Sequence, residues 1–288
     1  MNKKYLIAFA SPDLQHSVSR FFDQAKKLNF YDEICIFKID DLNLNYKKKI
    51  LELINKKNKK RGYGYWFWKP LIIQQLLNKI QENDIINYVD IGCHINSNGV
   101  DRLKHYIKKL QNSDKGILGF QYYPLKDYDN ENFKFPIPLE YKYSKADLLK
   151  YFNVLENKEI FSTPQYWSGN IFLLKNKFTI NFINKWLKVF NERFDLVDDT
   201  PSNIKNFDGF VQNQHDQSVF SILSKLDKVE SLSAYECEWF YHNGKRYWEH
   251  TKNNPIMAKR DLRYNFFKRF LNRQKRTLSR YYAKLFKN

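Results

Sequence analysis

The chain has 288 residues, 43% of them apolar and 17% aromatic, with a formal net charge of +18. This composition is too hydrophobic for a disordered protein, and the length suffices for a sizeable core without disulfides or metals. The three cysteines are widely spaced and form no Cys-x-x-Cys pair, which argues against a disulfide framework or a zinc site and favours a reducing compartment. The N-terminal apolar run is too short for a signal peptide, and no stretch approaches the ~18 apolar residues of a transmembrane helix. We therefore expect a globular, cytoplasmic protein.

Strands and helices are predicted to alternate along the first half of the chain. The predicted elements there are a strand over 4–10, a helix over 11–28, a strand over 33–39, helices over 50–55 and 70–80, and a strand over 84–89. Later elements are a helix over 100–111, a strand over 116–120, a helix after a capping box at Ser144, a strand over 166–175, and helices over 178–190 and 215–226. This order predicts an α/β fold with a mostly parallel sheet, whose ligands bind at the carboxyl ends of the strands.

Asp90 ends the most hydrophobic of these strands, and Gly92 follows it. A carboxylate at a strand end can hold a divalent cation that bridges the phosphates of a nucleoside diphosphate, and a glycine lets a ligand approach the backbone. The alternative is an aspartate that merely ends the strand and caps a turn.

A second candidate is the aromatic tract over 61–70, Arg-Gly-Tyr-Gly-Tyr-Trp-Phe-Trp-Lys-Pro. Its rings and Lys69 suggest a platform for a nucleotide base together with a phosphate contact, although Trp66 and Trp68 could equally be core residues. The end of the first strand reaches the same edge of the sheet, so nucleotide contacts are also expected from Phe9, Ala10 and Ser11. No phosphate-binding P-loop or G-x-G-x-x-G fingerprint is present, which disfavours a kinase or a dinucleotide enzyme.

Two polar segments follow in the second half of the chain. His215-Asp216-Gln217-Ser218 opens a helix after a long loop, where the side chains either face a ligand or simply cap the helix. His242-Asn243-Gly244-Lys245-Arg246-Tyr247-Trp248 combines one histidine, a turn and two cations. An isolated surface histidine is the alternative there.

Taken in order, these segments resemble the retaining GT-A glycosyltransferases of the glycogenin and lipopolysaccharide galactosyltransferase type. The four family motifs are Asp-x-Asp, Phe-Asn-x-Gly, Asp-Gln-Asp and His-x-x-Gly-x-x-Lys-Pro-Trp; the matching segments here are 90–92, 166–170, 216–218 and 242–248. The tract over 62–70 and the strand over 88–93 are similar to a group of bacterial surface-polysaccharide glycosyltransferases. The resemblance spans roughly residues 4 to 250 and rests on short motifs.

The resemblance implies a GT-A domain over 1–257 and a role for each matched residue. Asp90 and His242 would hold Mn²⁺ or Mg²⁺, Lys245 would contact the leaving diphosphate, and Asp216 and Gln217 would be catalytic; further donor contacts would come from Trp66, Lys69, Asp90, Gly92, Gly169 and Asn170. The sequence departs from the pattern at Gly92, which stands where a second carboxylate is expected, and at Tyr247, which stands where proline is expected. His94 or water could complete the metal site, or Lys69, Lys245 and Arg246 could neutralise the leaving group without a metal.

The last segment, 258–288, has eleven Lys or Arg residues and one acid, so it carries more than half of the net charge. Apolar and aromatic residues recur in it at three- and four-residue steps, which predicts a basic amphipathic helix at an anionic membrane surface. A helix docked on its own domain and a nucleic-acid-binding arm are the alternatives.

The combined prediction is a nucleotide-sugar-dependent glycosyltransferase. It would act on a lipid-linked lipopolysaccharide or capsule acceptor, peripherally at the inner face of the plasma membrane, with no nucleic-acid partner. A basic membrane-binding or nucleic-acid-binding adaptor and a nucleotidyltransferase are the alternatives. The sequence leaves open the donor, the acceptor and whether the anomeric configuration is retained or inverted.

Overall fold

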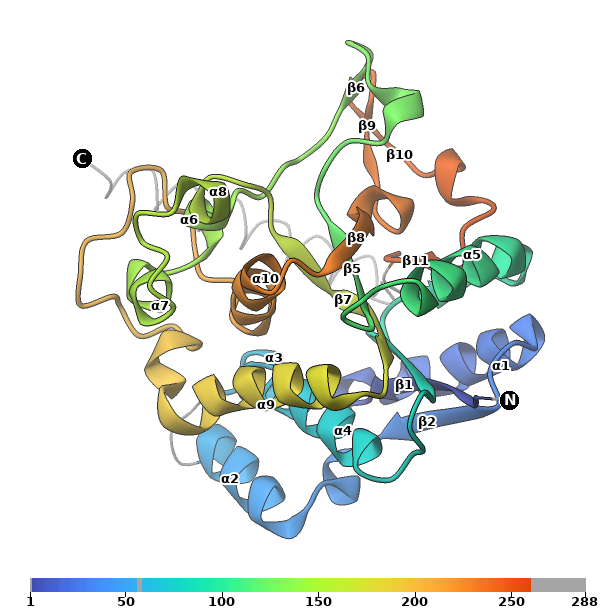
Figure 1. Cartoon of the computed structure of the whole chain (residues 1–288), viewed down its shortest axis with the longest axis horizontal. Helices are drawn as coiled ribbons and strands as arrows, with labels where there is room; N and C mark the ends of the chain where they lie inside the picture. Colours follow the sequence, from blue (N-terminus) through green and yellow to red (C-terminus); the bar gives the residue numbers. More distant parts are fainter. Residues whose placement is uncertain (1, 56–58, 260–288) are drawn as a thin grey trace, which may run out of the picture.

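The computed structural model describes residues 2–55 and 59–259 and is built around one six-stranded sheet (Figure 1). The strand order is β2-β1-β3-β7-β5-β8; β7 runs antiparallel to both of its neighbours, and the other adjacent pairs are parallel. The strands are β1 (Lys4–Phe9), β2 (Glu33–Phe37), β3 (Ile85–Val89), β5 (Ile117–Gln121), β7 (Tyr166–Leu174) and β8 (Glu230–Ser233). The α/β fold with a mostly parallel sheet is therefore confirmed.

Helices cover both faces of the sheet. They are α1 (Val18–Leu28), α2 (Leu44–Asn55), α3 (Gly62–Tyr65), α4 (Trp68–Leu77), α5 (Val100–Gln111), α6 (Glu140–Tyr143), α7 (Ala146–Tyr151), α8 (Lys158–Phe161), α9 (Lys177–Glu192) and α10 (Asp216–Leu226). Within β1, Ile7 and Phe9 join the core cluster under α4 and α9, whereas Leu6 and Ala8 join the cluster under α1 and α5. This period of two along a fully buried strand is what a central strand covered on both faces requires.

Two smaller sheets extend this body. β4 (His94–Ile95) pairs with β11 (Ile256–Met257), and β6 (Phe133–Lys134), β9 (Phe240–His242) and β10 (Lys245–Tyr247) form a three-stranded antiparallel sheet. We call β6, β9 and β10 the small sheet; it projects from the body at the top of Figure 1. The chain reaches it by the connections that leave the carboxyl ends of β5 and β8, so it belongs to the ligand-binding edge of the main sheet.

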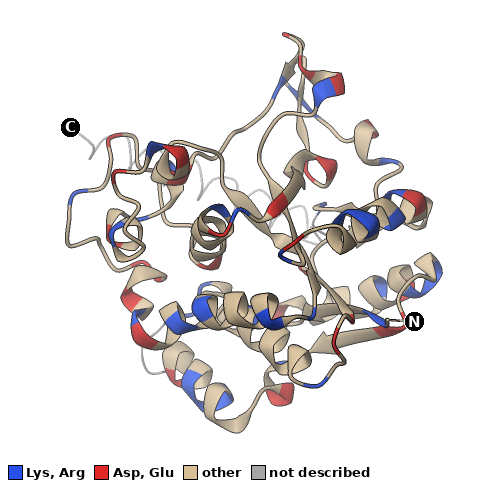
Figure 2. Ribbon diagram, viewed as in Figure 1, with Lys and Arg blue, Asp and Glu red and all other residues tan. Residues whose placement is uncertain are grey.

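Some predictions need correction or lie elsewhere. The capping box at Ser144 is wrong: Lys145 is the N-cap of α7, and the Ser144 hydroxyl instead donates to the buried carboxylate of Glu140 (2.5 Å). Positive and negative residues are interspersed over the described helices (Figure 2).

The predicted amphipathic helix over 258–288 lies, from residue 260 onward, outside the described residues. Among the described helices none is long and apolar enough to cross a membrane.

Candidate active site

Asp90 follows β3 at the edge where the parallel strands β1 and β3 end. β7 begins at this edge because it runs antiparallel to β3, with Val89 opposite Asn170. The backbone N–H of Asp90 donates to the carbonyl of Gly169 (2.9 Å). A Cβ on Gly169 would lie 2.4 Å from the indole of Trp167, so any larger residue would force that ring to move. The structure thus brings Gly169 and Asn170 beside Asp90.

Charged and polar side chains from α4, α10, β7 and β3 meet next to Asp90. The Lys69 ammonium, in the first turn of α4, lies 2.6 Å from a carboxylate oxygen of Asp216 and 3.5 Å from one of Asp90. Lys69 also donates to the Ser168 hydroxyl (3.0 Å), which itself donates to Asp216 (2.8 Å). The Tyr88 hydroxyl donates to Asp90 (2.5 Å). We call Lys69, Tyr88, Asp90, Ser168 and Asp216 the charged cluster.

The members of the charged cluster differ in exposure. The side chains of Lys69 and Asp216 are 2% and 6% exposed, whereas that of Asp90 is 32% exposed. Burial alone would lower the pKa of Lys69, but the charges of Asp216 and Asp90 outweigh it and raise the pKa, so Lys69 stays protonated. Burial raises the pKa of Asp216, and Lys69 opposes that effect. A ligand would therefore meet the charged cluster through Asp90.

A left-handed turn leads into Lys69. All five residues from Gly62 to Trp66 have positive φ, between 52° and 89°. A left-handed backbone costs roughly 1–2 kcal/mol for each non-glycine residue, so this turn is strained at its two tyrosines and at Trp66. The Trp68 indole, which donates to the Gly62 carbonyl (3.1 Å), and the Tyr65 hydroxyl, which donates to Asp199 (2.5 Å), hold it in place. Backbone strain of this kind is concentrated at functional sites.

His215 joins this turn to the start of α10. Its ring stacks on Trp66 (centroids 5.5 Å apart, 19° between planes) and meets Tyr65 edge-on (4.9 Å). Its Nδ1 lies 2.6 Å from the Val197 carbonyl, and its φ is +58°. These contacts fix the position of the next residue, Asp216. The stacking of His215 on the strained turn thus brings Asp216 to Lys69.

His215 should make the protein sensitive to acid. Burial lowers the pKa of His215 to about 4, although its hydrogen bond to Val197 opposes the shift. Between about pH 6.5 and pH 4 the unfolded chain binds a proton at this histidine that the folded chain does not, so stability is present above the unfolded pKa and falls on acidification, by up to ~3 kcal/mol. Urea unfolding across this range should show a smaller loss for His215→Gln than for the unaltered chain. His105→Gln, at an exposed histidine of α5, should keep the full loss; equal slopes for all three chains would refute the assignment.

The remaining predicted nucleotide contacts lie at the end of β1 and in the aromatic tract. Phe9 and Ala10 are buried at the end of β1, and Phe9 stacks on Trp68 (4.2 Å, 13°), so these rings pack in the core. The Ser11 hydroxyl donates to Asp13 (2.6 Å). In the aromatic tract, Trp66 is the tryptophan that keeps partial exposure. Its place as a contact for the base stays a prediction.

Gln217, the second predicted catalytic residue, follows Asp216 in the first turn of α10. Its side-chain amide donates to the side-chain oxygen Oε1 of Gln165 (2.9 Å), and the Gln165 amide nitrogen in turn donates to the buried Glu140 (2.8 Å). In this structure Gln217 is thus tied to a polar network beneath the sheet edge, and its catalytic role stays a prediction.

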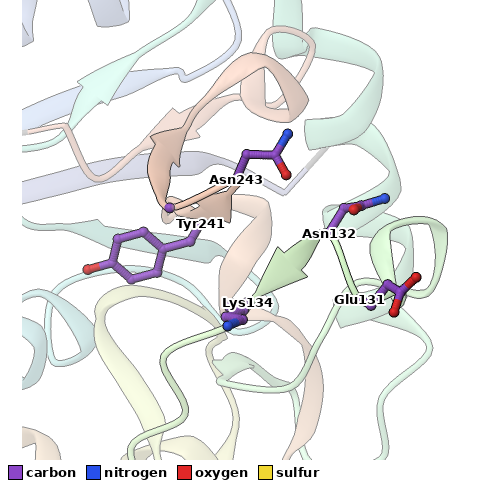
Figure 3. Close-up of a pocket in the computed structure, with 6 residues that line it drawn as sticks. Glu131, Asn132, Lys134, Tyr241 and Asn243 are labelled. Carbon is purple, nitrogen blue, oxygen red and sulfur yellow. The ribbon is translucent and has the colours of Figure 1, made fainter.

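His242 and Lys245 lie in the small sheet, opposite each other on β9 and β10. The ring of His242 stacks on Phe133 (4.6 Å, 23°), and Lys245 is exposed. A pocket of about 430 Å³ opens on this sheet (Figure 3). Its lining residues are Glu131, Asn132, Lys134, Tyr241, Asn243 and Gly244. None of the interactions described for His242 or Lys245 involves the charged cluster.

The side chains near Asp90 do not make a fitting site for a divalent cation. Such ions prefer several anionic oxygens, whereas position 92 is glycine and Lys69 already contacts Asp90. His94, the alternative ligand, has its Nδ1 3.2 Å from the amide nitrogen of Gln24. In residues 2–55 and 59–259 no group of three or more His, Cys, Asp or Glu side chains could hold a metal ion.

Comparisons with known proteins find similarity in structure alone. No protein-family model and no curated protein sequence matches the chain. A glycosyltransferase involved in glycosylation of the major capsid of PBCV-1 is 12% identical (TM-score 0.46, covering 91% of this chain and 94% of that one). Mouse xyloside xylosyltransferase 1 is 11% identical (TM-score 0.40, 82% and 87%), and the galactosyltransferase LgtC, solved with donor and acceptor sugar analogues, is 10% identical (TM-score 0.39, 82% and 75%). Similarity at these TM-scores does not assign a function, so the functional assignment rests on the residues of the site.

Three side chains of the site, Tyr88, Ser168 and His215, are not singled out individually by any sequence pattern. Ser168 lies within the segment matched to the second family motif, and Tyr88 lies two residues before Asp90 in β3, so both stand in segments that the sequence singles out. The sequence places His215 at a helix start, where its side chain either faces a ligand or caps the helix. Its role in holding the left-handed turn against α10 depends on a contact between segments about 150 residues apart, which no local pattern contains.

Proposed function

We propose that this protein transfers a sugar from a nucleoside-diphosphate donor to a glycan acceptor. The observation that supports this most is the charged cluster at the carboxyl edge of a mostly parallel sheet, where a partly exposed Asp90 lies beside the buried Lys69 and Asp216. Ligands bind at this edge in open α/β sheets, and a buried ion pair with a strained turn beside it indicates a site rather than a stabilising feature.

The proposed reaction breaks the bond between the anomeric carbon of the sugar and the diphosphate oxygen. The bonding electron pair leaves with the diphosphate, the oxygen of an acceptor hydroxyl bonds to the anomeric carbon, and the hydroxyl proton passes to a carboxylate. Asp90 has a free face toward solvent and would accept hydrogen bonds from sugar hydroxyls. Asp216, which contacts Ser168 and Lys69, would support Asp90 from the buried side of the charged cluster.

Donor binding tests this proposal directly. Thermal unfolding should be followed with UDP, GDP, CMP and their sugars, and with ATP as a control for non-specific phosphate binding. A ligand at a hundredfold its dissociation constant adds ~2.7 kcal/mol to the stability of the native state, so a true donor raises Tm by several degrees. If no nucleotide or nucleotide sugar raises Tm beyond ATP, the proposed function fails.

We also place the acceptor on a lipid at the inner face of the plasma membrane, on the strength of the basic segment 258–288. The full chain should sediment with vesicles that contain phosphatidylglycerol, less so at high salt, and a chain ending at Lys259 should stay in solution with donor binding intact. This end point keeps Ile256 and Met257, which pair with β4. If both chains sediment equally, this segment is not the membrane contact.

A further inference from the structure

Lys69 lies where a divalent cation would need to lie in order to join the two carboxylates of the site. Its Nζ bridges Asp216 (2.6 Å) and Asp90 (3.5 Å). We propose that the Lys69 ammonium is the resident cation of this site, and that donor binding and transfer need no divalent metal ion. This inference rests on the proposed function and concerns how its site is charged.

The ammonium is fixed in this position by the fold. Lys69 also donates to the hydroxyl (3.0 Å) and the carbonyl (3.2 Å) of Ser168, and its side chain is 2% exposed. An ammonium has three N–H donors, so Asp216 and the two oxygens of Ser168 satisfy all of them, with Asp90 close enough to share. Lys69 therefore cannot swing out to meet a diphosphate without leaving Asp216 unpaired in the interior.

A metal ion would compete with this arrangement. One oxygen of Asp216 accepts from both Lys69 and Ser168, and one oxygen of Asp90 accepts from Tyr88. A divalent cation bound to both carboxylates would be repelled by the positive charge of Lys69, because the site is buried and solvent screens charges there only weakly. The glycine at position 92 supplies no further ligand.

Lys69 acts in this scheme as a positioning residue. Two carboxylates and one ammonium leave the charged cluster with a single negative charge, which Asp90 presents to the ligand. A site with that charge suits sugar hydroxyls and the positive charge that develops on a sugar ring as the diphosphate leaves. Lys69 holds Asp90 and Asp216 in place without needing to touch the donor.

Manganese binding measured by electron paramagnetic resonance tests the proposal. The unaltered chain, alone or with UDP, should bind no more Mn²⁺ than UDP does by itself, and UDP affinity should change by less than about twofold between Mn²⁺ and EDTA. Lys69→Ala removes the ammonium from between the two carboxylates and should gain one Mn²⁺ site, which Lys69→Ala/Asp216→Asn should lose again. Lys108→Ala, at an exposed lysine of α5, should gain none.

An Mn²⁺ site in the unaltered chain that disappears in Asp90→Asn would overturn the proposal, as would a loss of UDP affinity of more than about tenfold in EDTA. These two measurements do not require Lys69→Ala to fold. If no nucleotide binds under any condition, the proposed function fails, whereas the Mn²⁺ titrations of the nucleotide-free chain still report on Lys69.

Discussion

Asp90→Asn should lower kcat/KM for sugar transfer at least ~100-fold, the scale on which removal of one catalytic or charge-stabilising group is felt. Asparagine keeps the shape of the side chain and its acceptor oxygen toward Tyr88, but it removes the single negative charge that the charged cluster presents. Because this side chain is 32% exposed, unfolding should change by less than about 1 kcal/mol. Transfer and acceptor-free donor hydrolysis should be measured together with urea unfolding.

Asp101→Asn is the matched control, since the Asp101 side chain is 94% exposed on α5. It should leave both transfer and hydrolysis unchanged. Asp216→Asn should differ from Asp90→Asn by also lowering stability, because it leaves the buried Lys69 with a weaker partner. Full transfer and full hydrolysis in Asp90→Asn would remove Asp90 from the active site.

Lys225→Met should cost ~3–5 kcal/mol of stability, the largest expected effect on folding, because it leaves a buried carboxylate without its counter-charge. Glu140 is fully buried, and it accepts hydrogen bonds from Lys225 (2.8 Å), Ser221 (2.5 Å) and Gln165 (2.8 Å). This network fastens the far end of α10, whose first residue is Asp216. The free energy of unfolding in urea measures the effect.

The double variant Lys225→Met/Glu140→Gln should recover much of this loss, since it removes the unpaired charge. Lys185→Met is the matched surface control: the Lys185 side chain is 47% exposed and pairs with Asp227, so its loss should cost less than about 1 kcal/mol. A loss below about 1 kcal/mol for Lys225→Met would mean that its pair with Glu140 contributes no more than an exposed ion pair does.

Local patterns predicted most of the fold. Strands such as β3 and helices such as α5 follow from continuous apolar runs and from apolar residues at helical spacing, signals that packing reinforces. The Ser144 capping box failed because Glu140, four residues earlier, offers its hydroxyl a buried carboxylate. Such competition is settled by which partner lies within reach in the folded chain.

The site was partly predictable for the same reason. Asp90 ends a buried strand, and the carboxyl ends of parallel strands meet at one edge, so its position follows from the sequence. The orientation of Lys69 does not. A lysine after an aromatic tract suggests a phosphate contact. In the structure, the left-handed turn before Lys69 instead directs its ammonium inward to Asp216. Non-glycine residues at positive φ cannot be predicted from composition.

Local patterns suffice for the alternation of strands and helices, for Asp90 at a strand end and for Asp216 at a helix start, because these features depend on neighbours a few residues away. Three features appear only in the folded chain: Lys69 joins the two carboxylates, β7 runs antiparallel and sets Gly169 beside Asp90, and His242 lies in the small sheet. Lys69 lies 21 residues from Asp90 and 147 from Asp216 along the chain, and only packing of the whole core selects such partners.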